Sequence, residues 1–168
     1  NSLNVMVTGT DVRLIDADSY QYGTWQCVTY TTTYVDPLLC VADAHGSPSL
    51  AKPHNVDSDN YALTIMVCET LLCVGPYGGT YAVKGGPRHN ARPMHRITVW
   101  HHDARYPRPA EQWRGLVPDD LMAHFTAVFQ HDARGAFPAA LLDNMRWTTC
   151  LSCGLEHARP QCPKVGCG

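Results

Sequence analysis

Four cysteines crowd into the last nineteen residues, and no other feature constrains the fold of this chain so strongly. Cys150 and Cys153 form a C-x₂-C pair that is followed by glycine, and Cys162 and Cys167 form a wider C-x₄-C pair. Two thiolates at the first spacing can point at one metal ion, and glycine tolerates the tight backbone around the sulfurs. Four thiolates would complete a closed tetrahedral site, so the pattern predicts a structural Zn²⁺.

The loop between the two pairs has only eight residues, and it leaves two alternatives open. His157 lies in this loop, so a compact Cys₃His set could use it together with the first three cysteines and leave Cys167 free. Two local disulfides could also staple the tail. The segment resembles the short zinc ribbons and knuckles that are appended to many proteins, which implies a tail folded around metal.

The other four cysteines, Cys27, Cys40, Cys68 and Cys73, lie in apolar contexts that are typical of strands. Buried free thiols explain them, because free cysteine behaves as a small hydrophobic residue. Four disulfides of a secreted chain would explain all eight cysteines equally well. Zinc binding would favour the inside of a cell, whereas disulfides would favour an extracellular or virion surface.

The first hundred residues have the pattern of β-structure. Residues 3–7 and 12–15 alternate around a Gly-Thr-Asp turn, and residues 45–60 have the composition of a long loop. Further strands are expected at residues 25–35, 38–42, 61–68, 71–75, 80–83 and 94–100. These segments predict an antiparallel β-sheet or sandwich over about residues 3–104.

Two helices are expected after this sheet. The first begins at Pro118, with acidic residues in its first turn and an apolar stripe formed by Leu121, Phe125, Val128 and Phe129. A shorter helix is expected within residues 139–147. The predicted class is therefore α+β, with a β-rich domain at residues 1–147 and a Cys-rich zinc-binding or disulfide-stapled tail at residues 148–168.

The charge is unevenly distributed along the chain. Residues 1–69 carry two basic and eight acidic side chains, whereas residues 70–168 carry eleven basic and seven acidic ones. The sequence pI of about 6.5 does not favour nucleic acid as a partner, since nucleic-acid-binding domains usually exceed about 9. No apolar run approaches the roughly 18 residues of a membrane helix, so no membrane partner is expected.

Residues 84–96 form a basic loop without a single acidic residue. Its four charges are those of Lys84, Arg88, Arg92 and Arg96. Arginine can bind carboxylate or phosphate groups in a bidentate way. We expect this loop to contact an acidic or phosphate-bearing macromolecule, and a protein more than a nucleic acid.

The sequence offers few candidates for catalytic residues. Neighbours on a strand point to opposite faces, so at most one of His101 and His102 could serve a zinc or iron site, together with Asp103, His95, His89 or His54. Solvated loop histidines are expected instead. Cys27 as a nucleophile with a histidine base would lie inside a strand, where a lowered thiol pKa is hard to justify. Nucleotide-binding and serine-hydrolase motifs are absent.

No residue is therefore assigned a catalytic role. The sequence favours a non-catalytic binding or assembly module with a structural zinc ion and a basic contact loop. Two other classes stay open: a secreted or viral-surface β-domain that is stapled by disulfides and binds a protein, and a hydrolase that uses His/Asp or Cys/His groups.

Overall fold

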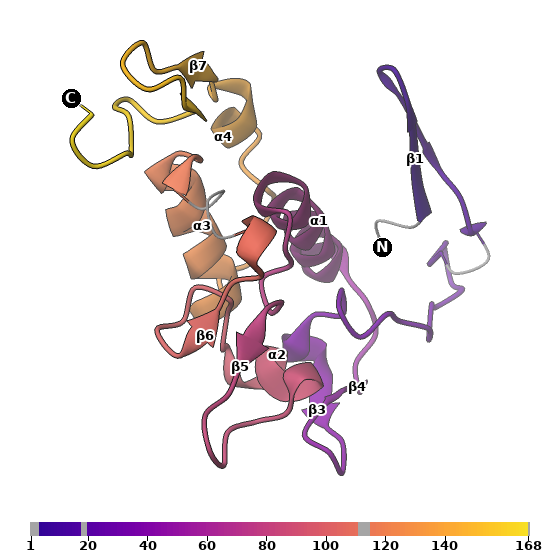
Figure 1. The fold of residues 1–168 in the computed structure, drawn as a ribbon. Coiled ribbons are helices and arrows are strands. Elements are labelled where there is room, and N and C mark those ends of the chain that lie inside the picture. The colour runs from indigo at the N-terminus through magenta and orange to yellow at the C-terminus, as the bar shows by residue number, and fades with distance from the viewer. Residues whose placement is uncertain (1–3, 18–19, 111–114, 168) are drawn as a thin grey trace.

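The computed structural model describes residues 4–17, 20–110 and 115–167, and its fold class is α+β (Figure 1). The longer helices are α1 (Val56–Leu72) and α3 (Asp119–Gln130), and the short ones are α2 (Arg92–His95) and α4 (Ala140–Asp143). The described residues also include the 3₁₀ turns η3 (Pro37–Leu39), η4 (His89–Ala91) and η5 (Arg108–Ala110). None of the described helices is long and apolar enough to span a membrane.

The strands form separate two-stranded antiparallel pairs. They are β1 (Val5–Thr8) with β2 (Asp11–Leu14), β3 (Cys40–Ala42) with β4 (Pro48–Leu50), β5 (Thr80–Tyr81) with β6 (Ala104–Arg105), and β7 (Thr148–Thr149) with β8 (Glu156–His157). The expected sheet or sandwich over residues 3–104 is wrong, since no sheet in the described residues exceeds two strands; residue 3 itself lies outside them. Helices, and not stacked sheets, fill the core.

Helix α1 replaces the strand that was expected at residues 61–68. The Asn55 side chain accepts a hydrogen bond from the Ser58 amide at 2.9 Å, and the Ser58 hydroxyl accepts one from the Asn55 amide at 2.9 Å. This reciprocal capping satisfies two amides at the start of the helix. Tyr61, Ile65 and Leu72 then recur at helical spacing and are buried on one face.

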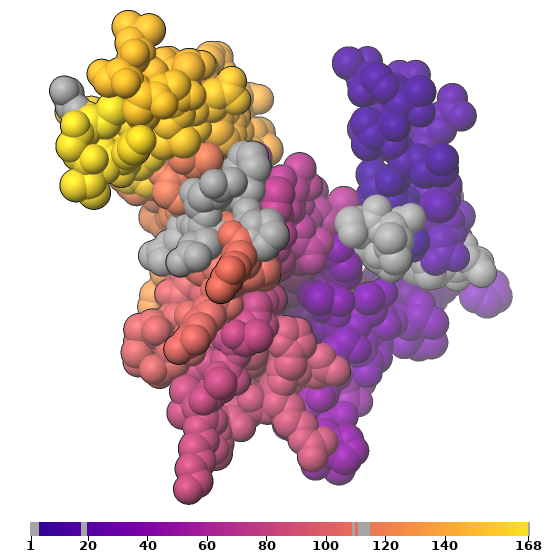
Figure 2. Space-filling view, in the orientation of Figure 1, coloured from indigo at the N-terminus to yellow at the C-terminus, as the bar shows by residue number. Residues whose placement is uncertain are grey.

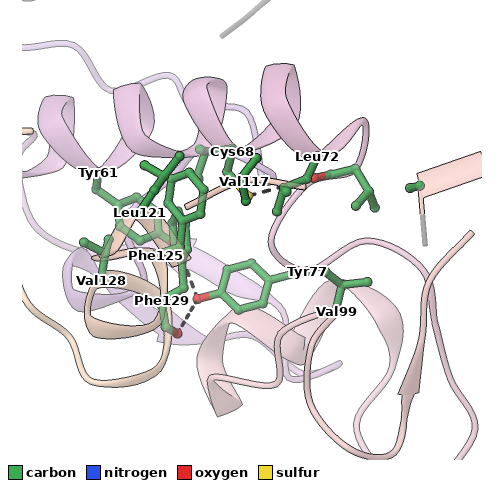
Figure 3. Packing of buried hydrophobic residues seen from close by; sticks show 13 residues of the cluster. Tyr61, Cys68, Leu72, Tyr77, Val99, Val117, Leu121, Phe125, Val128 and Phe129 are labelled. Carbon is green, nitrogen blue, oxygen red and sulfur yellow. Dashed lines mark hydrogen bonds between the residues drawn. The ribbon is translucent and has the colours of Figure 1, made fainter. Parts of the chain in front are cut away.

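The core lies where α1 meets α3 (Figure 3). The four residues of the predicted stripe on α3 are all buried, which confirms that stripe. The Tyr61 and Phe129 rings meet edge to face at 5.5 Å, a favoured aromatic geometry. The Tyr77 hydroxyl donates to the Phe129 carbonyl at 2.9 Å, so this side chain ties the loop after α1 to the last turn of α3.

Replacing Tyr77 with phenylalanine is expected to lower the free energy of unfolding by about 1–3 kcal/mol. The change keeps the ring but leaves the buried Phe129 carbonyl without its donor. Urea denaturation measures the loss, and Tyr22→Phe is the matched control because Tyr22 is 83% exposed. Equal stabilities for the two variants would contradict this role.

The β1–β2 hairpin stands apart from the helical body (Figures 1 and 2). Its pairing follows the predicted turn, but Met6, Val7, Val12 and Leu14 each leave more than half of their surface exposed. The strand expected at residues 25–35 is also wrong, because the described chain has only an isolated bridge between Tyr22 and Trp25 there. The apolar residues of the β1–β2 hairpin therefore contribute little to the core, whereas Val35, near the end of the second segment, is buried.

An ion pair joins two distant segments. The guanidinium of Arg134, which follows α3, binds the Asp36 carboxylate in a bidentate way at 2.7 and 2.6 Å. Asp36 is only 2% exposed and also caps η3 by accepting from the Leu38 amide at 2.9 Å. The Arg134 guanidinium lies over the Tyr61 ring at 4.5 Å. One buried carboxylate thus fixes η3 against both long helices.

Candidate metal centre

The β7–β8 hairpin places the first cysteine pair. The Cys150 amide donates to the Leu155 carbonyl at 2.9 Å, and the Gly154 amide donates to the Cys150 carbonyl at 2.8 Å. Gly154 has a φ of +72°, in the left-handed region that glycine adopts without strain. The glycine after the C-x₂-C pair therefore has the conformational role that the sequence indicated.

Four sulfur atoms converge in this tail. The Sγ atoms of Cys150, Cys153, Cys162 and Cys167 all lie within 4.8 Å of one another. The Cys150–Cys167 separation is 3.3 Å and the Cys153–Cys162 separation is 3.7 Å. A tetrahedral ion with bonds of about 2.3 Å to sulfur would space its ligands by about 3.8 Å, whereas a disulfide needs about 2.05 Å. The arrangement is compatible with a metal site, and no disulfide joins any of the eight cysteines in the structure.

His157 lies outside this group of ligand atoms. Its side chain is buried, with the residue 3% exposed, and its Nδ1 accepts a hydrogen bond from the Arg159 amide at 3.3 Å. Among the described residues, the group around these sulfurs consists of the four cysteines. The histidine instead belongs to the short segment that seats the tail on the body.

The tail rests on the beginning of α3. The Ala158 amide donates to the Leu116 carbonyl at 2.7 Å, and the Arg159 guanidinium pairs with the Asp119 carboxylate. Ala158, Leu116 and Val117 are buried at this contact. Ordering of the cysteine loop therefore affects α3, the helix that supplies Leu121, Phe125, Val128 and Phe129 to the core.

In the metal-free protein, close contacts between the sulfurs give the cysteine thiols different pKa values. A hydrogen bond from the Cys167 thiol, helped by the amides of Cys153 and Ser152, lowers the pKa of Cys150 to about 6. The same interaction with Cys150, together with one to Cys153, raises the pKa of Cys167 to about 12. At neutral pH one thiolate is thus held by neighbouring thiols, which is a starting point for metal capture.

Alkylation of the metal-free protein at pH 7 is expected to label Cys150 before Cys167, because only the thiolate is nucleophilic. A lowered pKa means that this preference is present above about pH 6 and is lost as the pH falls through that value. Iodoacetamide labelling followed by peptide mapping measures the order, with buried Cys68 as the unreactive internal control. Equal labelling of both cysteines at pH 7 would contradict it.

Two residues of the basic loop have internal roles. Arg92 is fully buried, and its guanidinium donates to the carbonyls of Ile97 and Gly78 at 3.0 and 2.9 Å. Arg96 binds the Asp132 carboxylate in a bidentate way at 2.6 and 3.1 Å. The expectation that Arg92 contacts a partner is therefore wrong, and Arg96 is already paired. Both side chains stabilise the loop itself.

Lys84 and Arg88 remain exposed. Beside Arg88 lies an open pocket of about 270 Å³, lined by His45, Ser47, Arg88, His89 and Asn90. An Arg88 Nη1 atom lies 3.5 Å from His45 Nδ1. His45 and Ser47 could not be predicted from the sequence as neighbours of Arg88, because they come from the β3–β4 turn, far from the basic loop in the chain.

The groups considered for catalysis fall into two places. Cys27 Sγ contacts the Thr29 hydroxyl at 3.3 Å, and no hydrogen bond joins it to a histidine within the described part of the chain. His101, His102 and Asp103 do converge, which the expected strand geometry excluded.

No family model, curated protein or solved structure matches this chain.

Proposed function

We propose that this protein is a non-catalytic binding or assembly module whose C-terminal tail is held by one structural zinc ion. The observation that carries the proposal is the convergence of four cysteine sulfurs within 4.8 Å. Thiolates favour zinc over the harder divalent cations, and four of them fill its tetrahedral shell. Such a shell leaves no position for water or substrate, which is the property of a structural site.

The contact surface in this proposal is the exposed part of the basic loop. Lys84 and Arg88 project from it, and Arg88 borders the pocket that His45 and His89 also line. Cationic and imidazole groups at one open pocket suit a carboxylate or phosphate group. The partner is accordingly an acidic or phosphate-bearing macromolecule, with an acidic protein segment as the favoured case.

Intact mass under native and denaturing conditions, without reductant, tests the zinc. The expected result is one zinc ion that a chelator removes, with eight free thiols on unfolding. A protein without metal whose mass is short by the hydrogens of disulfides would overturn the proposal in favour of the stapled extracellular class. Deletion of residues 148–168 is expected to destabilise or aggregate the protein rather than abolish a turnover.

Charge reversal tests the contact surface. Lys84→Glu with Arg88→Glu is expected to weaken binding of a fluorescent phosphoserine peptide or polyglutamate by at least about tenfold, because each charge-assisted hydrogen bond contributes about 1.5–3 kcal/mol. The matched control is Arg13→Glu with Arg108→Glu, which makes the same charge change at other exposed positions. Equal weakening in both pairs would show only a general charge effect and would contradict this surface.

A further inference from the structure

Residues 101–103 form a turn, and the strand expected at residues 94–100 is wrong, because the end of α2 and irregular chain occupy those residues. The His101 amide donates to the Thr98 carbonyl at 3.1 Å, and the Ala104 amide donates to the His101 carbonyl at 2.9 Å. Consecutive residues of a strand point to opposite faces, whereas a turn can bring them to one side. The His101 and His102 rings accordingly lie with their centroids 4.2 Å apart.

Three possible ligand atoms face one another in this turn. Asp103 Oδ2 lies 2.9 Å from His102 Nε2 and 3.9 Å from His101 Nδ1, and all three ligand atoms are within 4.8 Å of one another. Metal–nitrogen and metal–oxygen bonds of about 2.0–2.1 Å in a tetrahedral shell would space ligand atoms by about 3.3 Å. That spacing lies between the two distances from Asp103 Oδ2 to the histidine nitrogens.

The turn is anchored on both sides. Val99, which precedes it, is buried, and its amide donates to the Pro76 carbonyl at 2.7 Å. Ala104, which follows it, pairs with Tyr81 in the β5–β6 ladder, and the Tyr81 ring meets the His101 ring edge to face at 5.8 Å. In the metal-free protein the Asp103 amide donates to His101 Nδ1 at 3.3 Å, so an ion bound at this nitrogen would have to replace that long hydrogen bond. The anchored turn therefore holds the three side chains close together before any ion arrives, and binding breaks only this one hydrogen bond.

From this geometry we propose that His101, His102 and Asp103 form a second metal site, separate from the cysteine cluster, for a divalent transition-metal ion. Two imidazoles and one carboxylate suit zinc, cobalt, nickel or copper better than calcium or magnesium, which prefer oxygen ligands. Three protein ligands leave at least one coordination position open. The side chains of His102 and Asp103 are 80% and 43% exposed, so water or a group of a partner can reach that position.

Cobalt titration of protein that already holds one equivalent of zinc tests the site. Cobalt bound by thiolate shows intense near-ultraviolet charge transfer, whereas cobalt bound by nitrogen and oxygen shows only weaker visible bands, so the two sites are read separately. The expected result is a further equivalent of cobalt bound without the thiolate signal. Replacing either histidine with alanine should weaken it at least about tenfold, since even loss of an outer-shell partner costs about 10–100-fold.

His95→Ala is the matched control, because His95 is an exposed histidine outside the cluster and should leave cobalt binding unchanged. Asp103→Asn keeps the shape of the turn and removes the charge, so it should also weaken binding. Unchanged thermal midpoints show that these variants remain folded. The proposal is overturned if wild-type protein binds no further cobalt, or if the His101, His102 and His95 variants bind it equally. Failure of the cysteine site would appear separately, as missing thiolate-bound zinc.

Discussion

Replacing Cys153 with serine is expected to release the proposed zinc ion and to unfold the tail. Structural zinc sites contribute on the order of 10 kcal/mol, and a hydroxyl in place of one thiolate forfeits most of this affinity. Among the described residues 148–167, only His157 and Ala158 are buried, so the tail has almost no apolar core of its own. The ion is therefore expected to be the main stabilising element of this segment.

Hydrogen exchange resolves how far the unfolding spreads. The amides of the tail should lose their protection from hydrogen exchange. They include the Ala158 amide, because its hydrogen bond to the Leu116 carbonyl breaks when the tail separates from the body. The body should lose less, since the α1–α3 core does not use the tail. Cys73→Ser is the matched control: this thiol is exposed, lies outside the cluster and should change neither metal content nor exchange. If the tail amides of metal-free Cys153→Ser protein kept full protection from hydrogen exchange, the ion would not be what stabilises the tail, and the prediction would be wrong.

The features that could be predicted from the sequence are those whose residues lie close together along the chain. The cysteine pairs needed only a C-x₂-C turn and a nearby second pair for their sulfurs to meet. Helix α3 was predictable because a proline, two acidic residues and an apolar stripe at helical spacing all occur within twelve residues. In each case the physical cause lies within a few turns of chain.

Helix α1 was missed because its sequence carries two opposed signals. Asn55 and Ser58 have loop composition, yet here they form the cap that starts the helix. Beyond them the chain is rich in residues that fit strands, and apolar side chains such as Val56 and Leu63 also lie on the exposed face. An apolar run without one clear face does not distinguish a strand from a buried helix.

Roles that depend on distant segments were not predictable. Arg92 and Arg96 have the same local sequence context as Lys84 and Arg88, and only the folded chain shows that one is buried among carbonyls and the other is paired with Asp132. The convergence of His101 and His102 likewise depends on a turn that the alternation of the preceding residues did not indicate. The sequence identifies the charged and metal-binding side chains, but only the folded structure shows which of them can reach a partner or an ion.

Replacing Arg134 with methionine is expected to lower the free energy of unfolding by about 3–5 kcal/mol. The change keeps much of the side-chain length over the Tyr61 ring but leaves the Asp36 carboxylate buried without its cation. Removing one partner of a buried pair strands the other charge in a poorly solvated site, which costs more than the pair itself contributed. Chemical denaturation measures the loss.

Two further variants separate this cause from simple loss of a surface charge. Arg88→Met removes an exposed arginine and should change stability by no more than about 0.5 kcal/mol. Asp36→Asn combined with Arg134→Met removes both charges while an amide oxygen still accepts from the Leu38 amide, so it should recover part of the loss. If Arg134→Met were no less stable than Arg88→Met, η3 would be held by its apolar contacts alone. Recovery in the double variant would instead show that the stranded carboxylate, and not the missing arginine contacts, is what destabilises the single variant.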